Sequence, residues 1–405
     1  MSINISLEEA QERVLNHTSR LAPESVPILE ALGRVSAEDL YADSDLPAVQ
    51  QSAVDGYAVA SAGEGGMDKY YIVGHLCLGD NPQVPLKPGQ AMGVLTGGNL
   101  PSGTIAVVPH EKVQIQDDYL EAMEVIKAGN NIKQAGEDYV QGDLLVARGS
   151  VISPGHIGLL AAYGKESICV YRKPRVAVLC LSRHVIPWQL KPEPGQIRDS
   201  NGPLLSALVR QDGGLLVAAK TVGKDETSVK TVALDLLQQA DILIITGGTY
   251  TKGDSEARLL MEDLGAEILY WDVPIQPGSH TGASVLNSRL LFALSGNPGA
   301  CAVGYQLFVV PALLAMQGLT PRLQCLKARC SNGFAKKAGS RRFVRGRVSW
   351  DEQGWEVTVL PGQKPSMLRS LVNCNALIDI PANSPPVEIG QEVSILLLAG
   401  MERNK

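Results

Sequence analysis

The sequence has few cysteines, no long basic tract and no long uninterrupted apolar run. Its 7 cysteines are scattered over 405 residues without any CxxC spacing, which argues against a disulfide framework and against a cysteine-rich metal site. No run of Lys or Arg exceeds two residues and the net charge is −6, so general nucleic-acid binding is not expected. A small-molecule partner fits this composition better.

The sequence also lacks recognisable targeting and membrane segments. Its start, MSINISLEEAQERV, is acidic and amphipathic and has neither the basic nor the apolar region of a signal peptide. The longest apolar run is interrupted by Pro311 and falls short of the ~20 residues that span a membrane. Together with the scattered cysteines, these absences predict a cytoplasmic protein without a membrane partner.

Three short runs rich in Val, Ile and Leu stand out from this background. PRVAVLCLS, ADILIITGG and LLFALSGNPGA show no polar alternation and end in turn-forming residues, as do strands of a parallel sheet covered on both faces. Helical patterns follow in SNGPLLSALVRQDG, with Asn201 as a candidate N-cap, in SVKTVALDLLQQA and in SEARLLMEDLG. This alternation predicts a doubly wound α/β domain over residues 173–320, with ligands at the carboxyl ends of its strands.

The other parts of the chain predict different architectures. SLEEAQERVLNHT has the capping box Ser6 and Glu9, SVPILEALG is expected to form a second helix ending on Gly33, and another helix begins at Pro154. Turn-separated short strands predict a β-rich segment before that helix and a terminal barrel, or alternatively a sandwich, after the α/β domain. The expected division is a helical and mixed domain of residues 1–44 and 141–172, an inserted β-rich domain of residues 45–140, the α/β domain, and a β-barrel of residues 321–405.

Acids next to glycines recur in the expected loops. One such acid is usually a turn or cap residue, but several in one cleft would supply the oxygen ligands that Mg²⁺ requires, with phosphate oxygens completing the octahedron. The acids are Asp55, Asp138, Asp199, Asp225 and Asp254. The six histidines are dispersed and are not expected to act as ligands or bases.

Three loops that follow apolar strands could place backbone N–H groups against an anion. TGGNLPSG and TGGTYTKG are rich in glycine but match neither a Walker A nor a GxGxxG motif, so ordinary strand-ending turns remain an equal alternative. SGNP can also expose backbone at the sheet edge, because its Asn-Pro step prevents an immediate helix.

These motifs together resemble the molybdopterin molybdenumtransferase family, the MoeA proteins and the gephyrin E domain, over essentially the whole chain. The resemblance rests on SAVDGYAV, TGGNLPSGTIAVVPHE, QAGEDYVQGD, PRVAVLCLS, GQIRDSN, DILIITGGT, PIQPG, LSGNPGA, FVRG and SMLRSLVNCNALIDIP, which occur in the family's order and approximate spacing. It implies an elongated homodimer with its active site between subunits. It also implies adenylylated molybdopterin and molybdate as substrates, Mg²⁺ as cofactor, AMP release, and a MogA-like adenylyltransferase as a candidate partner.

The resemblance assigns roles to particular residues. The catalytic and metal-binding acids fall on Asp55, Asp138 and Asp225, and a catalytic loop threonine falls on Thr96. The cofactor-binding positions are Asp199, Gly247, Gly248, Ser295, Gly296, Asn297, Arg345 and Ser366.

The sequence departs from the family at several of its anion-binding positions. CLSRHV has Arg183 and His184 in place of an Asp-Glu pair, and QPGSH has Gln276 and Ser279 where the family's KPGKP has lysines. An anionic ligand thereby loses two charge-assisted contacts, which Arg183 or Lys252 could partly restore. In GGTYTKGDSEA the last Asp of the family's GGVSVGDYD falls on Ser255 or Glu256, near Asp254.

Three hypotheses follow from this pattern. The first is a molybdopterin molybdenumtransferase, acting with molybdenum or tungsten and weakened by the missing cations. The second is a non-catalytic paralogue that binds molybdopterin or the cofactor, or serves as a scaffold. The third is an enzyme for a different nucleotide-linked pterin or metal oxyanion.

Overall fold

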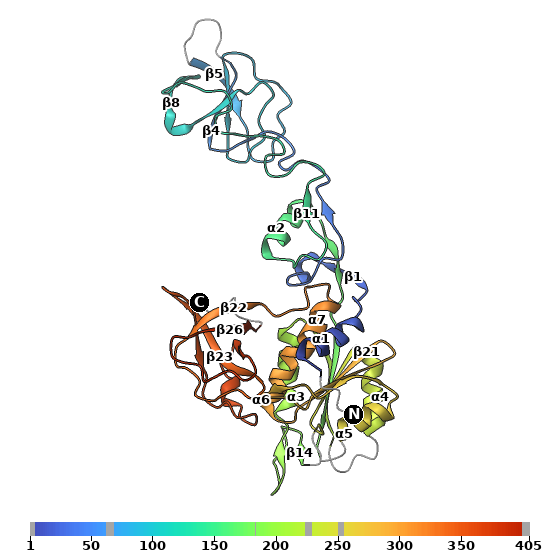
Figure 1. The fold of residues 1–405 in the computed structure, drawn as a ribbon. Helices are drawn as coiled ribbons and strands as arrows, with labels where there is room; N and C mark the ends of the chain where they lie inside the picture. The colour runs from blue at the N-terminus through green and yellow to red at the C-terminus, as the bar shows by residue number, and fades with distance from the viewer. Residues whose placement is uncertain (1–4, 62–68, 183, 223–228, 250–254, 399–405) are drawn as a thin grey trace. The chain divides into compact units, whose positions relative to one another are not determined.

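The computed structural model describes residues 5–61, 69–182, 184–222, 229–249 and 255–398 (Figure 1). The chain forms two compact units. The first contains residues 1–26, 33–37 and 169–405, and the second contains residues 27–32 and 38–168. The finer division into four domains given above stays a prediction.

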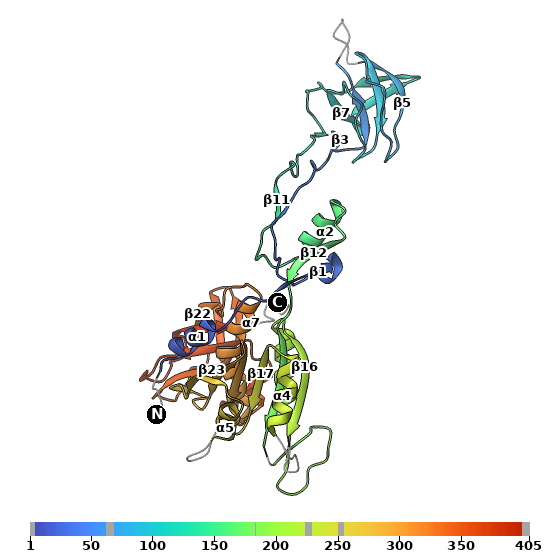
Figure 2. The same cartoon turned by 90° about the vertical axis from the view of Figure 1, so that its right-hand side faces the viewer.

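The centre of the first unit is a six-stranded sheet with helices on both faces (Figure 2). Four parallel strands come first in the order β16-β13-β17-β21. Strand β20 pairs antiparallel with β21, and β18 at the far edge pairs antiparallel with β20. The strands are β13 (Arg175–Leu181), β16 (Leu215–Val222), β17 (Ile242–Thr246), β18 (Glu267–Trp271), β20 (Gly282–Leu286) and β21 (Arg289–Leu294). The predicted doubly wound α/β domain is confirmed, although β18 and the antiparallel strand β20 were not foreseen.

The side chains of each strand alternate between two hydrophobic cores. Val176 and Val178 pack on the face covered by α3 (Asn201–Gln211) and the long helical segment Pro298–Met316. Ala177 and Leu179 pack on the other face, against α4 (Val229–Gln239) and α5 (Glu256–Asp263). Burial on both faces explains why these strands are continuously apolar.

The segment Pro298–Met316 comprises α6 (Pro298–Gly304), the π-helical turn η3 (Tyr305–Val309) and α7 (Val310–Met316). The expectation that the Asn-Pro step of SGNP prevents an immediate helix is wrong, because α6 begins at Pro298 and proline fits the first helical position. Pro311 has no N–H to donate to the carbonyl of Leu307, and Nε2 of Gln11 donates to that carbonyl instead, at 2.7 Å. The segment is long and apolar enough to cross a membrane, but 89% of its apolar window is buried inside the protein. Its surroundings are those of a core helix.

Gln11 belongs to α1 (Leu7–Asn16), which packs against α7 and β18. The predicted capping box is present, because Ser6 Oγ accepts from the N–H of Glu9 and the Glu9 carboxylate accepts from the N–H of Ser6. The second expected helix is wrong. Residues Pro23–Pro27 form strand β1, which pairs with β12 (Ser167–Tyr171), and only the short 3₁₀ turn η1 (Ile28–Glu30) follows. Pairing with β12, far away in the sequence, decides the structure of this segment.

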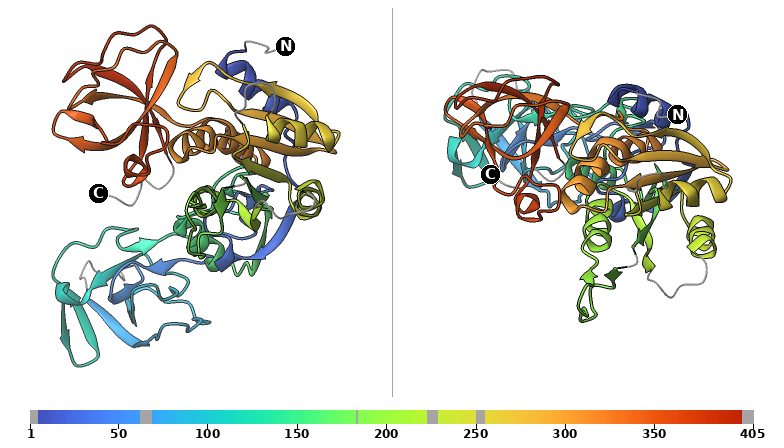
Figure 3. Two further views of the ribbon diagram at one scale, coloured as in Figure 1. Left: turned by 90° about the horizontal axis from the view of Figure 1, so that it is seen from below. Right: turned by 60° about the horizontal axis from the view of Figure 1, so that its bottom comes forward.

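A closed β-barrel completes the first unit (Figure 3). Its five strands are β22 (Cys325–Cys330), β23 (Arg341–Asp351), β24 (Gly354–Val359), β25 (Ala376–Ile380) and β26 (Glu392–Leu397), and the pairing of β23 with β25 closes it. The short strand β19 (Ile275–Gln276) of the α/β domain pairs with β23 outside this ring. The barrel prediction is confirmed.

The second unit contains the predicted β-rich sheet in the order β7-β4-β6-β5-β9-β8. Its strands are β4 (Gly56–Val59), β5 (Lys69–His75), β6 (Gln90–Val94), β7 (Ala106–Pro109), β8 (Val113–Gln116) and β9 (Tyr119–Ala122), with the 3₁₀ turn η2 (His110–Lys112) after β7. Two short antiparallel pairs join it to the helical part, namely β2 (Leu40–Tyr41) with β11 (Leu144–Val146) and β3 (Gln51–Ser52) with β10 (Ile132–Lys133). The expected helix at Pro154 is α2 (Pro154–Ala162).

Candidate functional site

The loops after β17 and β21 lie backbone to backbone at the carboxyl edge of the α/β sheet. Gly247 has φ +87°, and a Cβ atom there would lie 2.2 Å from the carbonyl oxygen of Leu181. A Cβ on Gly296 would lie 3.3 Å from Cα of Gly247. Gly248 also has a positive φ, +62°. Glycine is therefore required at position 247, where a side chain would collide with the carbonyl of Leu181.

A buried network fixes the turn that contains Ser295, Gly296 and Asn297. Nδ2 of Asn201 donates to Oγ1 of Thr246 and to the carbonyl of Gly296, each at 2.9 Å. Thr246 in turn donates to the carbonyl of Ser295 at 3.1 Å. The expectation that Asn201 is the N-cap of its helix is wrong, because Ser200 occupies that position and Asn201 is the first helical residue. Its buried amide instead connects α3 to two strand-ending loops.

Asp199 is 5% exposed and both of its carboxylate oxygens are engaged. Oδ1 accepts from the N–H of Gly202 in the first turn of α3, and Oδ2 accepts from Oγ1 of Thr221 on β16, each at 2.8 Å. Burial, and after it the charge of Asp199, raise the pKa of the Cys180 thiol, so this cysteine is protonated at neutral pH. Asp199 therefore joins α3 to the edge strand of the sheet.

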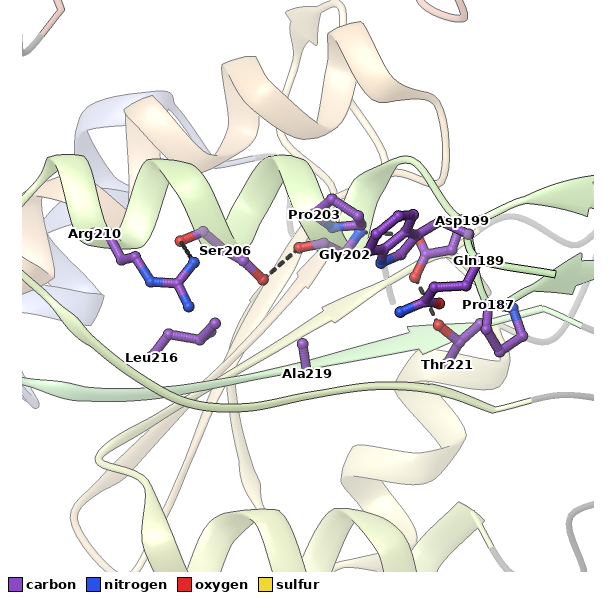
Figure 4. A pocket seen from close by; sticks show the side chains of 11 residues that line it. Pro187, Gln189, Asp199, Gly202, Pro203, Ser206, Arg210, Leu216, Ala219 and Thr221 are labelled. Atoms are coloured by element: carbon purple, nitrogen blue, oxygen red, sulfur yellow. Dashed lines mark hydrogen bonds between the residues drawn. The ribbon is translucent and has the colours of Figure 1, made fainter.

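A pocket of about 520 Å³ lies beside Asp199, between α3 and β16 (Figure 4). The loop between the two-residue strands β14 (Val185–Ile186) and β15 (Ile197–Arg198) covers one end of it with the indole of Trp188 and the amide of Gln189. Arg210 lies at the other end. An aromatic face next to polar groups suits a planar, polar-edged ring.

Three loops of the first unit converge on the first turn of α6. The N–H of Gly299 donates to the carbonyl of Pro365 at 2.8 Å, and Ser366, the next residue, is exposed. A Cβ on Gly299 would lie 3.3 Å from both Cζ and Nη1 of Arg345, and one on Gly278 would lie 3.3 Å from the carbonyl oxygen of Ala300. The structure thus brings together the predicted residues Ser295, Gly296, Asn297, Arg345 and the neighbourhood of Ser366.

Arg345 is a buried cation held by neutral groups. It is 1% exposed; Nε donates to Oγ of Ser370 at 2.7 Å and Nη2 donates to the carbonyl of Gly362 at 3.2 Å. Nη1 has no hydrogen-bond partner among the described residues, and no described carboxylate forms an ion pair with this guanidinium. Burial lowers the pKa of Arg345, but arginine remains charged at neutral pH. An uncompensated positive charge therefore lies against Gly299.

A second guanidinium, that of Arg342, contacts Gln276, one of the two residues that replace the family's lysines. Nη2 of Arg342 donates to Oε1 of Gln276 at 2.6 Å, and its Cζ lies 5.5 Å from the ring centroid of Phe334. Sequence reasoning missed Arg342, because the pairing of β19 with β23 has no local signature. Arg183 and Lys252, which were proposed instead, lie outside the described residues. His184 is exposed and its N–H donates to Oγ of Ser182 at 3.3 Å.

The predicted acids of the second unit lie on two separate turns. Oδ1 of Asp55 accepts from the N–H and from Oγ1 of Thr96, at 2.7 and 2.9 Å, and these bonds hold the pKa of Asp55 below its ordinary value. Asp138 forms an ion pair with Lys133 at 2.6 Å. Asp225 and Asp254 lie outside the described residues. Within the described ranges no three His, Cys, Asp or Glu side chains could together hold a metal ion, so Mg²⁺ would need ligand oxygens as well.

Ser255 is the N-cap of α5. Its Oγ accepts from the N–H of Arg258 at 3.3 Å and donates to the carbonyl of Gly248 at 2.8 Å. Glu256 is the next residue, in the first helical turn. Of the two candidates for the family's last Asp, Ser255 is the one with a capping role.

Three family models match the chain in sequence. They are described as the MoeA N-terminal region (domain I and II), matching residues 5–164, a probable molybdopterin binding domain, matching residues 177–315, and the MoeA C-terminal region (domain IV), matching residues 327–398. The fold and its loops thus define a multidomain protein of molybdenum cofactor biosynthesis.

Relatives and solved structures agree with that class. A molybdopterin molybdenumtransferase of Bacillus subtilis is 31% identical over 97% of this chain and 94% of its own, and one of Staphylococcus aureus is 30% identical over 97% and 95%. A crystal structure of a molybdopterin biosynthesis MoeA protein from Pyrococcus horikoshii is 26% identical and covers 97% of this chain and 100% of its own, with a TM-score of 0.80. The chain belongs to the molybdopterin molybdenumtransferase family, and it is an enzyme of that family.

Proposed function

We propose that this enzyme inserts molybdenum, supplied as molybdate, into adenylylated molybdopterin, in a reaction that needs Mg²⁺ and releases AMP. The observation that carries the proposal is the convergence of the loops around Ser295, Gly278 and Pro365 on the first turn of α6, beside the unpaired charge of Arg345. A buried cation without a carboxylate partner favours an anionic group near it, because no described acid neutralises its charge.

The proposed roles of the remaining residues follow from their contacts. The pocket lined by Trp188 and Gln189 takes the planar pterin, with Asp199 fixing its wall. Gly247 and Gly248, with Gly296 and Asn297, line the phosphate loop, and Ser366 faces the oxyanion. These proposed roles combine what the resemblance implies with the positions of the residues around α6.

The acids of the second unit are proposed to act on Mg²⁺. Asp55 fits a Mg²⁺ ligand, because Thr96 keeps it ionised through Oδ1 while the side chain stays exposed. Asp138 and Asp225 would serve with it, and Thr96 would orient the carboxylate. Bound Mg²⁺ would neutralise charge on the phosphate anhydride as AMP leaves.

We also propose that the enzyme is a cytoplasmic homodimer. Helix α2 is apolar around its circumference. Leu29 of the adjacent turn η1 is 80% exposed, and Leu32, just after this turn, is 55% exposed. Such a surface is usually covered in an assembly, and the resemblance supplies a second copy of the chain as the occupant. A MogA-like adenylyltransferase would supply the adenylylated substrate.

The test is molybdate-dependent cofactor formation by the purified chain, with AMP release followed in parallel. The wild type should show weak but measurable activity that stops when EDTA removes Mg²⁺. Gln276→Lys/Ser279→Lys should add little, because Arg342 already supplies a cation beside Gln276. If the wild type is inactive and the two lysines restore activity, the result would instead favour a non-catalytic binding or scaffold paralogue. The loss of those lysines is the observation that suggests this alternative. Substituting tungstate for molybdate tests the metal.

A further inference from the structure

Arg342 lies half-buried at the edge of the barrel, in contact with the loop that approaches α6. The register of β19 on β23 places Gln276 beside Arg342, and the Gln276 side chain accepts the 2.6 Å hydrogen bond described above. Two residues further along the chain, Gly278 lies against the carbonyl of Ala300. The same short loop therefore contacts both Arg342 and the turn beside Arg345.

The charge of Arg342 is not neutralised by a described acid. Its Nη2 bonds to a neutral amide, its Nε is buried without a hydrogen-bond partner among the described residues, and its guanidinium lies over the ring of Phe334. Its neighbour Arg341 differs, because Asp379 accepts two hydrogen bonds from it and Glu8 accepts a third. The chain thus neutralises one of two adjacent arginines and leaves the other available.

We propose that Arg342 is a second anion-binding residue of this enzyme, and that Gln276 is its positioning residue. The inference rests on the proposed function and adds to it. The ligand is a tetrahedral oxyanion group, either free molybdate or the phosphate of the nucleotide-linked substrate. A guanidinium forms two parallel hydrogen bonds with such a group, which a lysine cannot do.

The contacts of Arg342 explain how it is prepared for this role. Stacking on Phe334 and the bond to Gln276 restrict a side chain that is otherwise costly to order. Arg342 and Arg345 are three residues apart on one strand, so their backbones are separated by about 10 Å and they extend from opposite faces. Two separate anionic groups, rather than one, match that spacing.

The experiment measures binding by isothermal titration, with sodium molybdate in one arm and AMP with Mg²⁺ in the other. Arg342→Ala should weaken at least one arm by about tenfold or more, which corresponds to the loss of one charge-assisted hydrogen bond. Arg342→Lys should restore part of it, and Gln276→Ala should produce a smaller loss in the same arm. Arg347→Ala is the matched control, since Arg347 is an exposed arginine on the same strand.

The outcomes separate this inference from the proposed function. The inference would be overturned if Arg342→Ala bound both ligands as tightly as the wild type does. It would also be overturned if the wild type bound neither ligand. Binding that depends on Arg342 without any cofactor formation would support the inference and remove the proposed function. Circular dichroism of each variant identifies misfolding, and Arg342→Lys, which keeps the charge, then decides the case.

Discussion

The hydroxyl of Ser370 accepts a 2.7 Å hydrogen bond from Nε of Arg345 and donates one of 2.8 Å to the carbonyl of Gly362. Both side chains are fully buried, so the hydroxyl satisfies part of a cation that water does not reach. Ser370→Ala should therefore lower the free energy of unfolding by about 1–3 kcal/mol. Scanning calorimetry measures the change, and Ser349→Ala, at an exposed serine of β23, should leave the transition unmoved. Equal transitions in both variants would contradict this account.

Asp212, at the carboxyl end of α3, should make stability depend on pH. Burial raises its pKa to about 6, above its ordinary value of 3.8. The folded state therefore favours the protonated carboxyl. Below pH 3.8 Asp212 costs the protein no stability, and stability is lost as the pH rises through about 6. Asp212→Asn should raise the free energy of unfolding at pH 7.5 by up to about 3 kcal/mol, seen as a higher melting temperature, and leave it unchanged near pH 3.5.

The control for Asp212 is Asp235→Asn, because Asp235 is exposed on α4. It should not alter the pH profile. A gain from Asp212→Asn that is equal at both pH values would show that packing, and not ionisation, is responsible.

Asp55 should act on Mg²⁺ without supporting the fold. Asp55→Asn keeps the size of the side chain but removes the charge, so Mg²⁺-dependent AMP release should fall about tenfold or more while the melting temperature stays the same. Thr96→Val removes one of two donors to Oδ1 and should have a smaller effect. Asp118→Asn, at another exposed acid of the second unit, is the control. An Asp55→Asn enzyme with an unchanged Mg²⁺ requirement would make Asp55 a turn residue.

Leu29 tests the proposed dimer. Leu29→Glu places a charge on the exposed apolar surface of η1 and should yield a 43.2 kDa monomer at micromolar concentration, whereas the wild type sediments at twice that mass. Ile389→Glu, at an exposed barrel residue, should remain dimeric. A dimeric Leu29→Glu, or a monomeric wild type, would contradict the proposed interface.

Local signals in the sequence predicted much of the fold. The runs that became β13, β17 and β21 are buried on both faces and therefore apolar throughout, and Ser6 with Glu9 predicted the start of α1. The helix expected around Pro27 does not form, because β1 pairs with β12, which lies 140 residues later in the sequence. That partner leaves no local trace in the sequence.

Some residues of the candidate site could be predicted from local motifs, and others could not. Asp55 and Thr96 follow from motifs, and the structure joins them directly. Arg342 could not be found from the sequence, because its contact with Gln276 spans 66 residues and depends on the register of two strands. Asn201 was misread as a cap for a related reason, since its acceptors lie far away in the sequence: Thr246 is the last residue of β17 and Gly296 lies in the loop after β21.

The bond from Gln11 to the carbonyl that Pro311 leaves free also concerns how the chain is made. Donor and acceptor are 296 residues apart, so the ribosome, at roughly 5–20 residues per second, needs about 15–60 s to synthesise the acceptor after the donor. Throughout that interval α1 lacks its packing partner, and Leu7, Ala10 and Val14 lack the core that later buries them. The earliest helix to be synthesised is thus among the last to dock, and until then its apolar face has no core to cover it.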